Sequence, residues 1–138
     1  MKKKIVVLGF LGTNLDQGGK PRWGRWRPTI SLAQQDDLLV DRFELFYEKN
    51  FLDLAQLVQK DFQQVSPETE FNLREVVLKD PWDFQTVYSG IFDNLKDYKF
   101  DTDNEEYLVH ITTGTHVIQI CLFLLSIIRK QILPLLFF

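Results

Sequence analysis

The sequence predicts an α/β domain of Rossmann-like topology, with three layers in which helices cover a mainly parallel sheet. Two observations carry this prediction. Stretches with strand patterning alternate along the chain with stretches of helical periodicity, as is typical of a parallel sheet wrapped by helices. The first strand, residues 5–10, is a continuous apolar run, as expected of a strand buried on both faces. The length of 138 residues allows one such domain.

The first half of the chain is divided by glycine and proline. A long glycine-rich loop follows the first strand, and Pro28 opens a short helix that extends to about Gln35. A second strand is predicted over residues 41–48 from its alternating pattern. Apolar residues at helical spacing then predict a helix over residues 52–65, which Ser66 and Pro67 end.

The second half continues the alternation. Residues 70–78 are expected to form the third strand and residues 107–111 the fourth. Between them, Asp80 is predicted to cap a helix whose first position is Pro81 and which continues to about Leu95. A last helix is predicted to start near Thr115.

The C-terminal stretch is almost wholly apolar from Val117 onward, but Arg129 and Lys130 interrupt it. A membrane span needs about 20 predominantly apolar residues, so we expect a buried helix instead. We expect no further strand to cover this helix. The sequence therefore predicts an α/β domain over residues 1–134 that is shortened at its C-terminus, followed by a divergent apolar tail over 135–138.

Charge is distributed unevenly along the chain. The net charge is -3, yet residues 1–35 hold seven basic side chains and one acidic one, a local excess of +6. This asymmetry favours a local anion site over general affinity for nucleic acid, although Lys2 to Lys4 are also explained as a solubilising start. The apolar run after Lys4 is too short for a signal peptide, so a cytoplasmic protein is expected.

Two loops leave the carboxyl ends of predicted strands, where open α/β sheets bind ligands. In the first, Gly12 allows close approach of the backbone, while Thr13 and Asn14 can form hydrogen bonds; a plain turn is the alternative. The second presents hydroxyl and amide groups at a helix N-terminus, which suit phosphate or another anion. Its residues are Thr112, Thr113, Gly114, Thr115 and His116. The alternative is that Thr115 only caps the helix and Thr112 only belongs to the strand.

A third candidate element interleaves arginine with tryptophan. Arginine makes bidentate contacts to phosphate and tryptophan stacks on bases, so the segment suits a ligand that contains a nucleotide. The alternative is a tryptophan pair that packs on the sheet beneath arginine stems. The residues are Arg22, Trp23, Arg25, Trp26 and Arg27.

Groups typical of catalysis are scarce. Two histidines and one cysteine give no metal cluster, and no cofactor is expected. His110 is interpreted as a structural residue of the fourth strand and Cys121 as a core thiol. His116 is the one acid–base candidate, and a single histidine does not make a mechanism. We therefore predict no catalytic residue.

Several segments together resemble the N-terminal domain of the RtcR family, the bacterial transcriptional activators of an operon for an RNA ligase and an RNA 3′-phosphate cyclase. They are GFLGTNLD, RWGRWRPT, VDRFEL, VSPETE, DPWDF and YLVHITTGTHVIQICLFLL, and the resemblance covers about residues 4–130. It implies a CARF domain, a sensor that typically dimerises and binds cyclic oligoadenylates or related nucleotides across the dimer. It also implies sensing of RNA ends, with RNA that carries a 2′,3′-cyclic phosphate as a candidate signal.

The resemblance carries over to Gly12 and Thr13 in the first loop and to residues 112–116 in the second. Many CARF relatives have Lys or Arg where this sequence has His116. In the family this domain restrains an AAA+ ATPase, and a helix-turn-helix domain that binds DNA follows; the sequence shows neither. A homodimer that binds without turnover is the expectation. The alternatives are a ring nuclease that cleaves cyclic oligoadenylate, with Thr115 and His116 as suspected groups, and a non-functional fragment.

Overall fold

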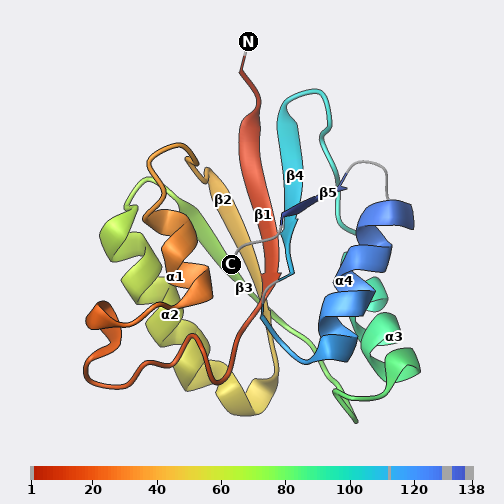
Figure 1. Cartoon of the computed structure of the whole chain (residues 1–138). Coiled ribbons are helices and arrows are strands. Elements are labelled where there is room, and N and C mark those ends of the chain that lie inside the picture. Colours follow the sequence, from red (N-terminus) through yellow and green to blue (C-terminus); the bar gives the residue numbers. More distant parts are fainter. Residues whose placement is uncertain (1, 112, 129–131, 136–138) are drawn as a thin grey trace.

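The computed structural model describes residues 2–111, 113–128 and 132–135 (Figure 1). Parallel strands form one five-stranded sheet in the order β3-β2-β1-β4-β5. The strands are β1 (Lys4–Phe10), β2 (Arg42–Tyr47), β3 (Glu70–Glu75), β4 (Glu105–His110) and β5 (Ile132–Leu135). This arrangement confirms the predicted Rossmann-like α/β fold.

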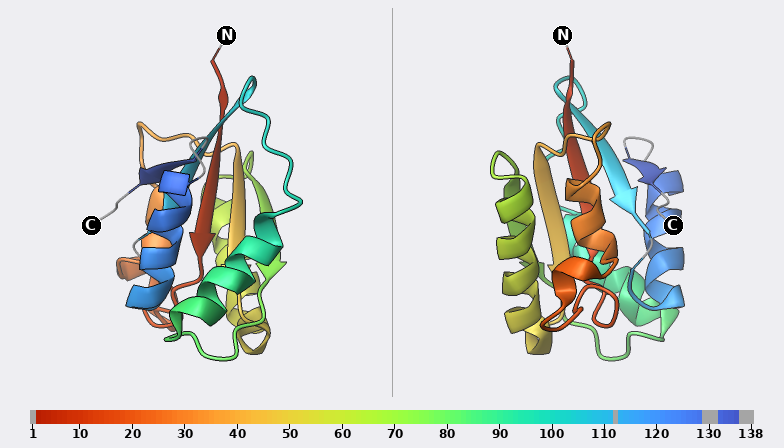
Figure 2. Two further views of the ribbon diagram at one scale, coloured as in Figure 1. Left: turned by 90° about the vertical axis from the view of Figure 1, so that its right-hand side faces the viewer. Right: turned by 60° about the vertical axis from the view of Figure 1, so that its left-hand side comes forward.

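Helices cover both faces of the sheet. They are α1 (Pro28–Ala33), α2 (Leu52–Val65), α3 (Phe84–Leu95) and α4 (His116–Ile128), with the short 3-10 helices η1 (Arg22–Gly24) and η2 (Lys49–Phe51). Helices α1 and α2 lie on one side of the sheet and α3 and α4 on the other (Figure 2). The three layers follow from the alternation of strands and helices along the sequence.

Strand β1 lies in the middle of the sheet and supplies both halves of the core. Val6, Leu8 and Phe10 pack with residues of α3 and α4, whereas Val7 packs with residues of α1 and α2. Since successive side chains of a strand point to opposite faces, a strand covered on both faces is mostly apolar along its whole length. The burial of β1 on both faces therefore explains the continuous apolar run in its sequence.

Part of the large aromatic content lies in the layer between the sheet and α2. The Phe43 ring stacks on Phe71, with 5.0 Å between ring centroids, and meets Phe62 edge-on at 5.4 Å. Aromatic pairs of this kind contribute about 0.5–1.5 kcal/mol each beyond their area burial. These rings fix α2 against β2 and β3.

The predicted start of the third helix is wrong by three residues. The N-cap of α3 is Asp83, whose Oδ2 accepts the Thr86 backbone N–H at 3.0 Å and the Thr86 hydroxyl at 2.6 Å. Asp80 instead accepts the backbone N–H of Trp82 in a turn that precedes the helix. The residues between β3 and α3 therefore form a loop, and its Pro81 and Trp82 line the cavity described below.

The expectation that no strand follows the last helix is also wrong. After α4 the chain adds β5 parallel to β4, with register pairs from Tyr107 and Ile132 to His110 and Leu135. The expected tail therefore begins within a strand at Leu135, and its residues 136–138 lie outside the described residues.

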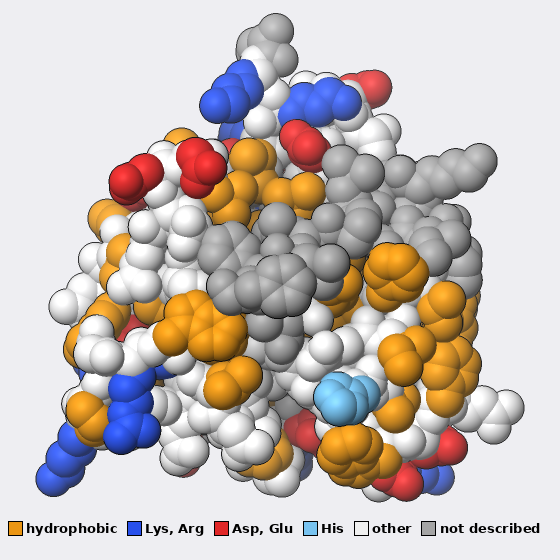
Figure 3. Space-filling model, viewed as in Figure 1, with side chains coloured by type: hydrophobic (Ala, Val, Ile, Leu, Met, Phe, Trp, Pro, Cys, Tyr) orange, Lys and Arg blue, Asp and Glu red, His pale blue; other side chains and the backbone are white. Residues whose placement is uncertain are grey.

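Helix α4 is only partly buried. Cys121, Leu122 and Leu125 belong to the core shared with α3, which confirms Cys121 as a core thiol. Ile120 and Phe123 are 52% and 42% exposed, and hydrophobic side chains gather over this helix on the surface (Figure 3). In the described part of the chain, no helix has the length and apolarity that crossing a membrane requires.

His110 is buried in β4 beside Gly9 of β1. An added Cβ on Gly9 would lie 3.4 Å from His110 Cβ and 3.1 Å from Phe43 Cζ, so the glycine makes room for both rings. Among the described residues neither ring nitrogen has a hydrogen-bond partner. Burial lowers the pKa of His110 to about 4, which fits the structural role expected for it.

His110 is expected to make stability depend on pH between about 4 and 6.5. In the unfolded chain the imidazole takes up a proton as the pH falls below its ordinary pKa of 6.5. In the folded chain it does so only near pH 4, because its pKa there is about 4. The free energy of unfolding therefore falls with falling pH, by up to about 1.4 kcal/mol per pH unit from this residue. Urea unfolding at several pH values should show a shallower pH dependence for His110→Leu than for wild type. Parallel wild-type and His110→Leu curves would contradict this.

Candidate functional site

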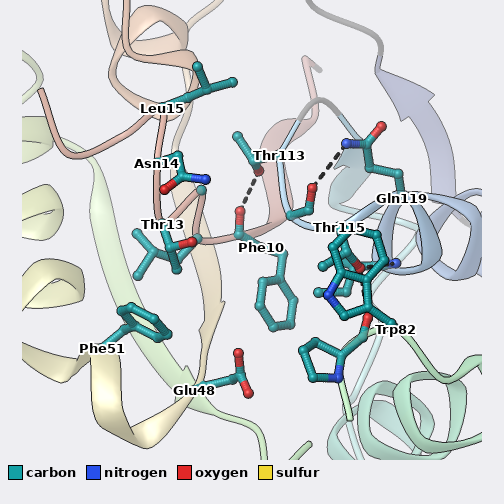
Figure 4. Close-up of a pocket in the computed structure, with 15 residues that line it drawn as sticks. Phe10, Thr13, Asn14, Leu15, Glu48, Phe51, Trp82, Thr113, Thr115 and Gln119 are labelled. Atoms are coloured by element: carbon teal, nitrogen blue, oxygen red, sulfur yellow. Dashed lines mark hydrogen bonds between the residues drawn. The ribbon is translucent and has the colours of Figure 1, made fainter.

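A cavity of about 410 Å³ lies at the carboxyl ends of the strands, next to the point where the strand order reverses between β1 and β4 (Figure 4). Loops that leave β1 and β4 turn toward opposite layers there, and ligands of open α/β sheets bind in the crevice between them. The volume is within the usual range for small-molecule sites. The lining residues are Phe10, Leu11, Gly12, Thr13, Asn14, Leu15, Glu48, Phe51, Pro81, Trp82, Thr113, Gly114, Thr115, Ile118 and Gln119.

The buried Asp16 shapes the loop after β1. Its carboxylate accepts the Gly12 backbone N–H at 2.8 Å, the Thr29 hydroxyl at 2.7 Å and the Thr29 backbone N–H at 2.9 Å. Burial raises the pKa of Asp16, and the hydrogen bonds from Thr29 and Gly12 oppose that rise. The loop is thereby closed on itself and fastened to the start of α1.

The two predicted loops meet at Gly12 and Thr113. An added Cβ on Gly12 would lie only 2.9 Å from Thr113 Cγ2, so a larger residue at position 12 would push the loops apart. The Thr113 hydroxyl donates a hydrogen bond to the backbone oxygen of Phe10, which joins the loop after β4 to the end of β1. This contact places the two loops considered in the sequence side by side.

The loop after β4 delivers the N-terminus of α4 to the cavity. Gly114 has a φ of +91°, a region that favours glycine. The Thr115 hydroxyl donates to the Pro81 backbone oxygen at 2.8 Å and accepts the Ile118 N–H at 3.1 Å. Thr115 therefore caps the helix, which is the alternative given for it in the sequence analysis. Helix geometry leaves the first N–H groups of α4 without intrahelical acceptors, and these carry the positive end of the dipole.

Glu48 lines the cavity on the side of β2 and brings a carboxylate to it. It is the one charged side chain among the described residues that line the cavity, and burial raises its pKa. No lysine or arginine is among the described residues of that lining. The groups of this lining that suit an anion are therefore neutral donors, among them the backbone N–H groups at the start of α4.

The arginine and tryptophan segment lies elsewhere, with η1 beside α2 and on the other side of the sheet from α4 (Figure 1). Arg22 Nε and Arg27 NH1 bind the Asp61 carboxylate of α2 at 2.7 and 2.9 Å, and Arg27 Nε donates to the Asp16 backbone oxygen at 2.7 Å. Arg27 is 2% exposed, so the ligand contact predicted for it is corrected: its guanidinium serves the protein interior.

The other members of that segment remain at the surface. Trp23 and Trp26 are 43% and 48% exposed, and Arg25 is exposed as well. The alternative of a tryptophan pair beneath arginine is met in part: the Arg22 and Arg27 guanidiniums lie over the Trp23 ring, 5.9 Å from its centroid. None of the segment lines the cavity.

The structure thus brings six of the predicted residues together at the cavity. They are Gly12, Thr13, Asn14, Thr113, Gly114 and Thr115. His116 is exposed and outside the lining, and Thr112 lies outside the described residues. Sequence reasoning missed Glu48, Phe51, Trp82 and Gln119, although the strand-end rule could have drawn attention to the first two, which follow β2 directly.

Comparison of the sequence with known proteins gives one consistent result. The family model described as "RtcR: Regulator of RNA terminal phosphate cyclase" matches residues 3–135. The transcriptional regulatory protein RtcR of Escherichia coli (strain K12) is 47% identical over 126 residues, which are 90% of this chain and 24% of that protein. The chain therefore spans about a quarter of the length of this relative, and the similarity extends beyond the residue 130 expected from the sequence.

Comparison of the structure identifies relatives of the same fold. Enterococcus italicus Csm6 bound to cyclic hexa-2′-fluoro-hexa-dAMP aligns with a TM-score of 0.73 and 16% identity, over 98% of this chain and 34% of that one. Can2 from Sulfobacillus thermosulfidooxidans, in complex with cyclic tetra-adenylate, aligns with a TM-score of 0.54 and 16% identity, over 94% of this chain and 31% of that one. These alignments confirm the predicted CARF-type fold.

Proposed function

This chain belongs to the RtcR family of regulators of RNA terminal phosphate cyclase, and on that premise we propose that it is a regulatory sensor domain that binds a nucleotide signal. The observation that carries the proposal is the cavity between the loops after β1 and β4, with the N-terminus of α4 at its wall. Support comes from the two structural relatives, which were solved with cyclic adenylates bound.

The cavity suits a phosphodiester better than a terminal phosphate. Backbone N–H groups at a helix N-terminus bind anions without any side-chain cation. A phosphomonoester carries a charge of about -1.5 to -2 at pH 7, which this lining, with Glu48 and no basic side chain, compensates poorly. A 2′,3′-cyclic phosphate at an RNA end, or a phosphodiester of a cyclic oligoadenylate, carries a single negative charge. These two ligand classes are therefore our candidates.

We propose that the domain binds without turnover. The Thr115 hydroxyl, one of the two suspected catalytic groups, is engaged by the Pro81 oxygen and the Ile118 N–H. His116, the other group, is exposed and outside the cavity lining. A nucleophile and a base within hydrogen-bond reach are the signature of covalent catalysis, and these two residues do not provide it. Cleavage of cyclic oligoadenylate is accordingly not favoured.

The wider setting follows from the family. We propose that two copies of this domain form a homodimer, that the signal releases an AAA+ ATPase from restraint, and that a separate helix-turn-helix domain contacts DNA. A regulator of transcription acts in the bacterial cytoplasm, where we place this domain. The sensor is proposed to occupy residues 1–135, the end of β5, in place of the boundary at residue 134 expected from the sequence.

Direct titration tests the proposed function. One RNA oligonucleotide is prepared with a 2′,3′-cyclic phosphate, a 3′-phosphate or a 3′-hydroxyl end, and cyclic tetra- and hexa-adenylate complete the set. We expect saturable binding of the cyclic-phosphate RNA or of a cyclic oligoadenylate, with the RNA ends discriminated by roughly tenfold or more, because a hydrogen-bonded charge contributes about 1.5–3 kcal/mol. Chromatography after incubation should return the ligand uncut. Absence of binding to every ligand by the folded protein would refute the proposal.

A further inference from the structure

We propose that Glu48 determines the specificity of this cavity by accepting hydrogen bonds from N–H or O–H groups of the ligand, while Trp82 offers a stacking surface beside it. The inference rests on the proposed function and deepens it, because it assigns the part of the nucleotide that lies away from the phosphate. Neither residue was predicted from the sequence, and both line the cavity.

The first support is the lack of a protein partner for Glu48. Its side chain is half-buried, yet within the described residues its carboxylate has no hydrogen bond or ion pair. Four other buried or partly buried carboxylates near the sheet each accept hydrogen bonds from the protein. The pairs are Asp16 with Gly12 and Thr29, Glu44 with Asn72 and Arg74, Asp61 with Arg22 and Arg27, and Glu105 with Arg42 and Tyr107. Partial burial of an unpaired carboxylate is unfavourable. A ligand donor would remove that cost.

The second support is the position of the carboxylate in the cavity. Figure 4 shows Glu48 facing the cavity with Phe51 on one side and Trp82 on the other, while Thr115 and Gln119 lie toward α4. A phosphate next to Glu48 would meet a like charge, whereas at the start of α4 it meets N–H groups and the helix dipole. The ligand is therefore oriented with its phosphate toward α4 and a neutral donor group toward Glu48.

The third support is the aromatic surface next to the carboxylate. The Trp82 side chain is 65% exposed at the cavity, a large apolar area with no core to fill. Stacking of a base on an aromatic ring is tolerant of sequence, so Trp82 supplies affinity and the hydrogen bonds to Glu48 supply selectivity. Tryptophan for stacking and a carboxylate for N–H donors together describe a nucleoside subsite.

Two parts of a nucleotide present suitable donors. A carboxylate has two acceptor oxygens, and the exocyclic amino groups of adenine, cytosine and guanine donate to it. Guanine has two adjacent N–H donors and fits both oxygens, whereas uracil has a single N–H between carbonyl groups. A ribose 2′-hydroxyl is the second source. The experiment must separate the base from the sugar.

The test compares wild type, Glu48→Gln and the control Glu106→Gln, which makes the same change on an exposed residue of β4. The ligands are RNA oligonucleotides with a 2′,3′-cyclic phosphate that differ only in the terminal base, and a second set without the 2′-hydroxyl on the penultimate ribose. We expect Glu48→Gln to weaken binding of the preferred RNA by about 10-fold to 100-fold, since it replaces a charged acceptor by an amide. Glu106→Gln should bind like wild type.

The pattern of losses identifies the donor. If the base donates, wild type discriminates among terminal bases and Glu48→Gln loses that discrimination. If the ribose donates, the deoxy RNA binds wild type as weakly as Glu48→Gln binds the parent RNA, and the two changes together cost no more than either. Glu48→Gln binding all RNAs as wild type does, or all of them more tightly, would overturn the inference and leave the proposed function intact. Failure of wild type to bind any of these RNAs or either cyclic oligoadenylate would overturn both.

Discussion

Replacing Asp61 with alanine is expected to lower the free energy of unfolding by about 3–5 kcal/mol, because it removes one partner of a buried ion pair. The side chains of Asp61 and Arg27 are each 1% exposed, and Arg22 binds the same carboxylate from the rim. Among the described residues Arg27 NH2 already has no partner, so the guanidinium would be left with one hydrogen bond to the Asp16 backbone oxygen. Urea denaturation followed by circular dichroism measures the loss.

Two further variants make this prediction specific. Lys60→Ala changes an exposed neighbour on the same helix and should stay within about 0.5 kcal/mol of wild type. The double variant Asp61→Leu with Arg27→Met should recover much of the stability, because replacing a buried pair by apolar groups is often neutral. A loss below about 1 kcal/mol in Asp61→Ala would show that the pair is not buried as described and that the loop after β1 is fastened in another way.

Gly114→Ala is expected to weaken ligand binding by more than tenfold. A Cβ at this position would lie 2.8 Å from Ile118 Cγ2, and the φ of +91° is itself unfavourable for alanine. Strain of this kind costs about 1–3 kcal/mol, and relieving it must move the loop away from the start of α4. The N–H groups proposed to bind phosphate would then no longer face the cavity. Titration with the preferred ligand, together with a melting curve, measures both effects.

Gly24→Ala is the matched control for that change. An added Cβ on Gly24 has no heavy atom within 4 Å, and the residue lies in η1, outside the cavity. We expect wild-type affinity and a stability change within about 0.5 kcal/mol. Wild-type affinity in Gly114→Ala would mean that the N-terminus of α4 does not contact the ligand.

Most of the fold could be predicted from the sequence because hydrophobic periodicity reports burial directly. Strand β5 was not predicted because a short apolar run has no periodicity that separates a strand from an apolar tail. In the structure its Pro134 pairs opposite Val109 at the edge of the sheet, where a residue without an N–H group is tolerated. The start of α3 was misplaced because Asp80 and Asp83 are both good capping residues. Only the contacts of their carboxylates separate the turn from the helix.

The parts of the candidate site that depend on residues close in sequence could be predicted, whereas contacts between residues far apart in sequence could not. Gly12 and Gly114 lie in the loops that leave the ends of β1 and β4, so the strand-end rule locates them. The pairing of Arg22 and Arg27 with Asp61 could not be predicted, because Asp61 is 39 and 34 residues away in the sequence. Basic residues beside tryptophan look the same in a sequence whether they bind a ligand or a carboxylate. Glu48 was missed because an acidic residue after a strand is usually solvated.

Hydrogen exchange with and without saturating ligand tests most directly the central claim that the signal binds between the loops after β1 and β4. The backbone amides of the full chain would be followed by mass spectrometry in the presence of the RNA or cyclic oligonucleotide that binds best. We predict slower exchange in residues 12–15 and 113–119, and little change in residues 22–27. Slower exchange confined to residues 22–27, with 12–15 and 113–119 unchanged, would contradict the account.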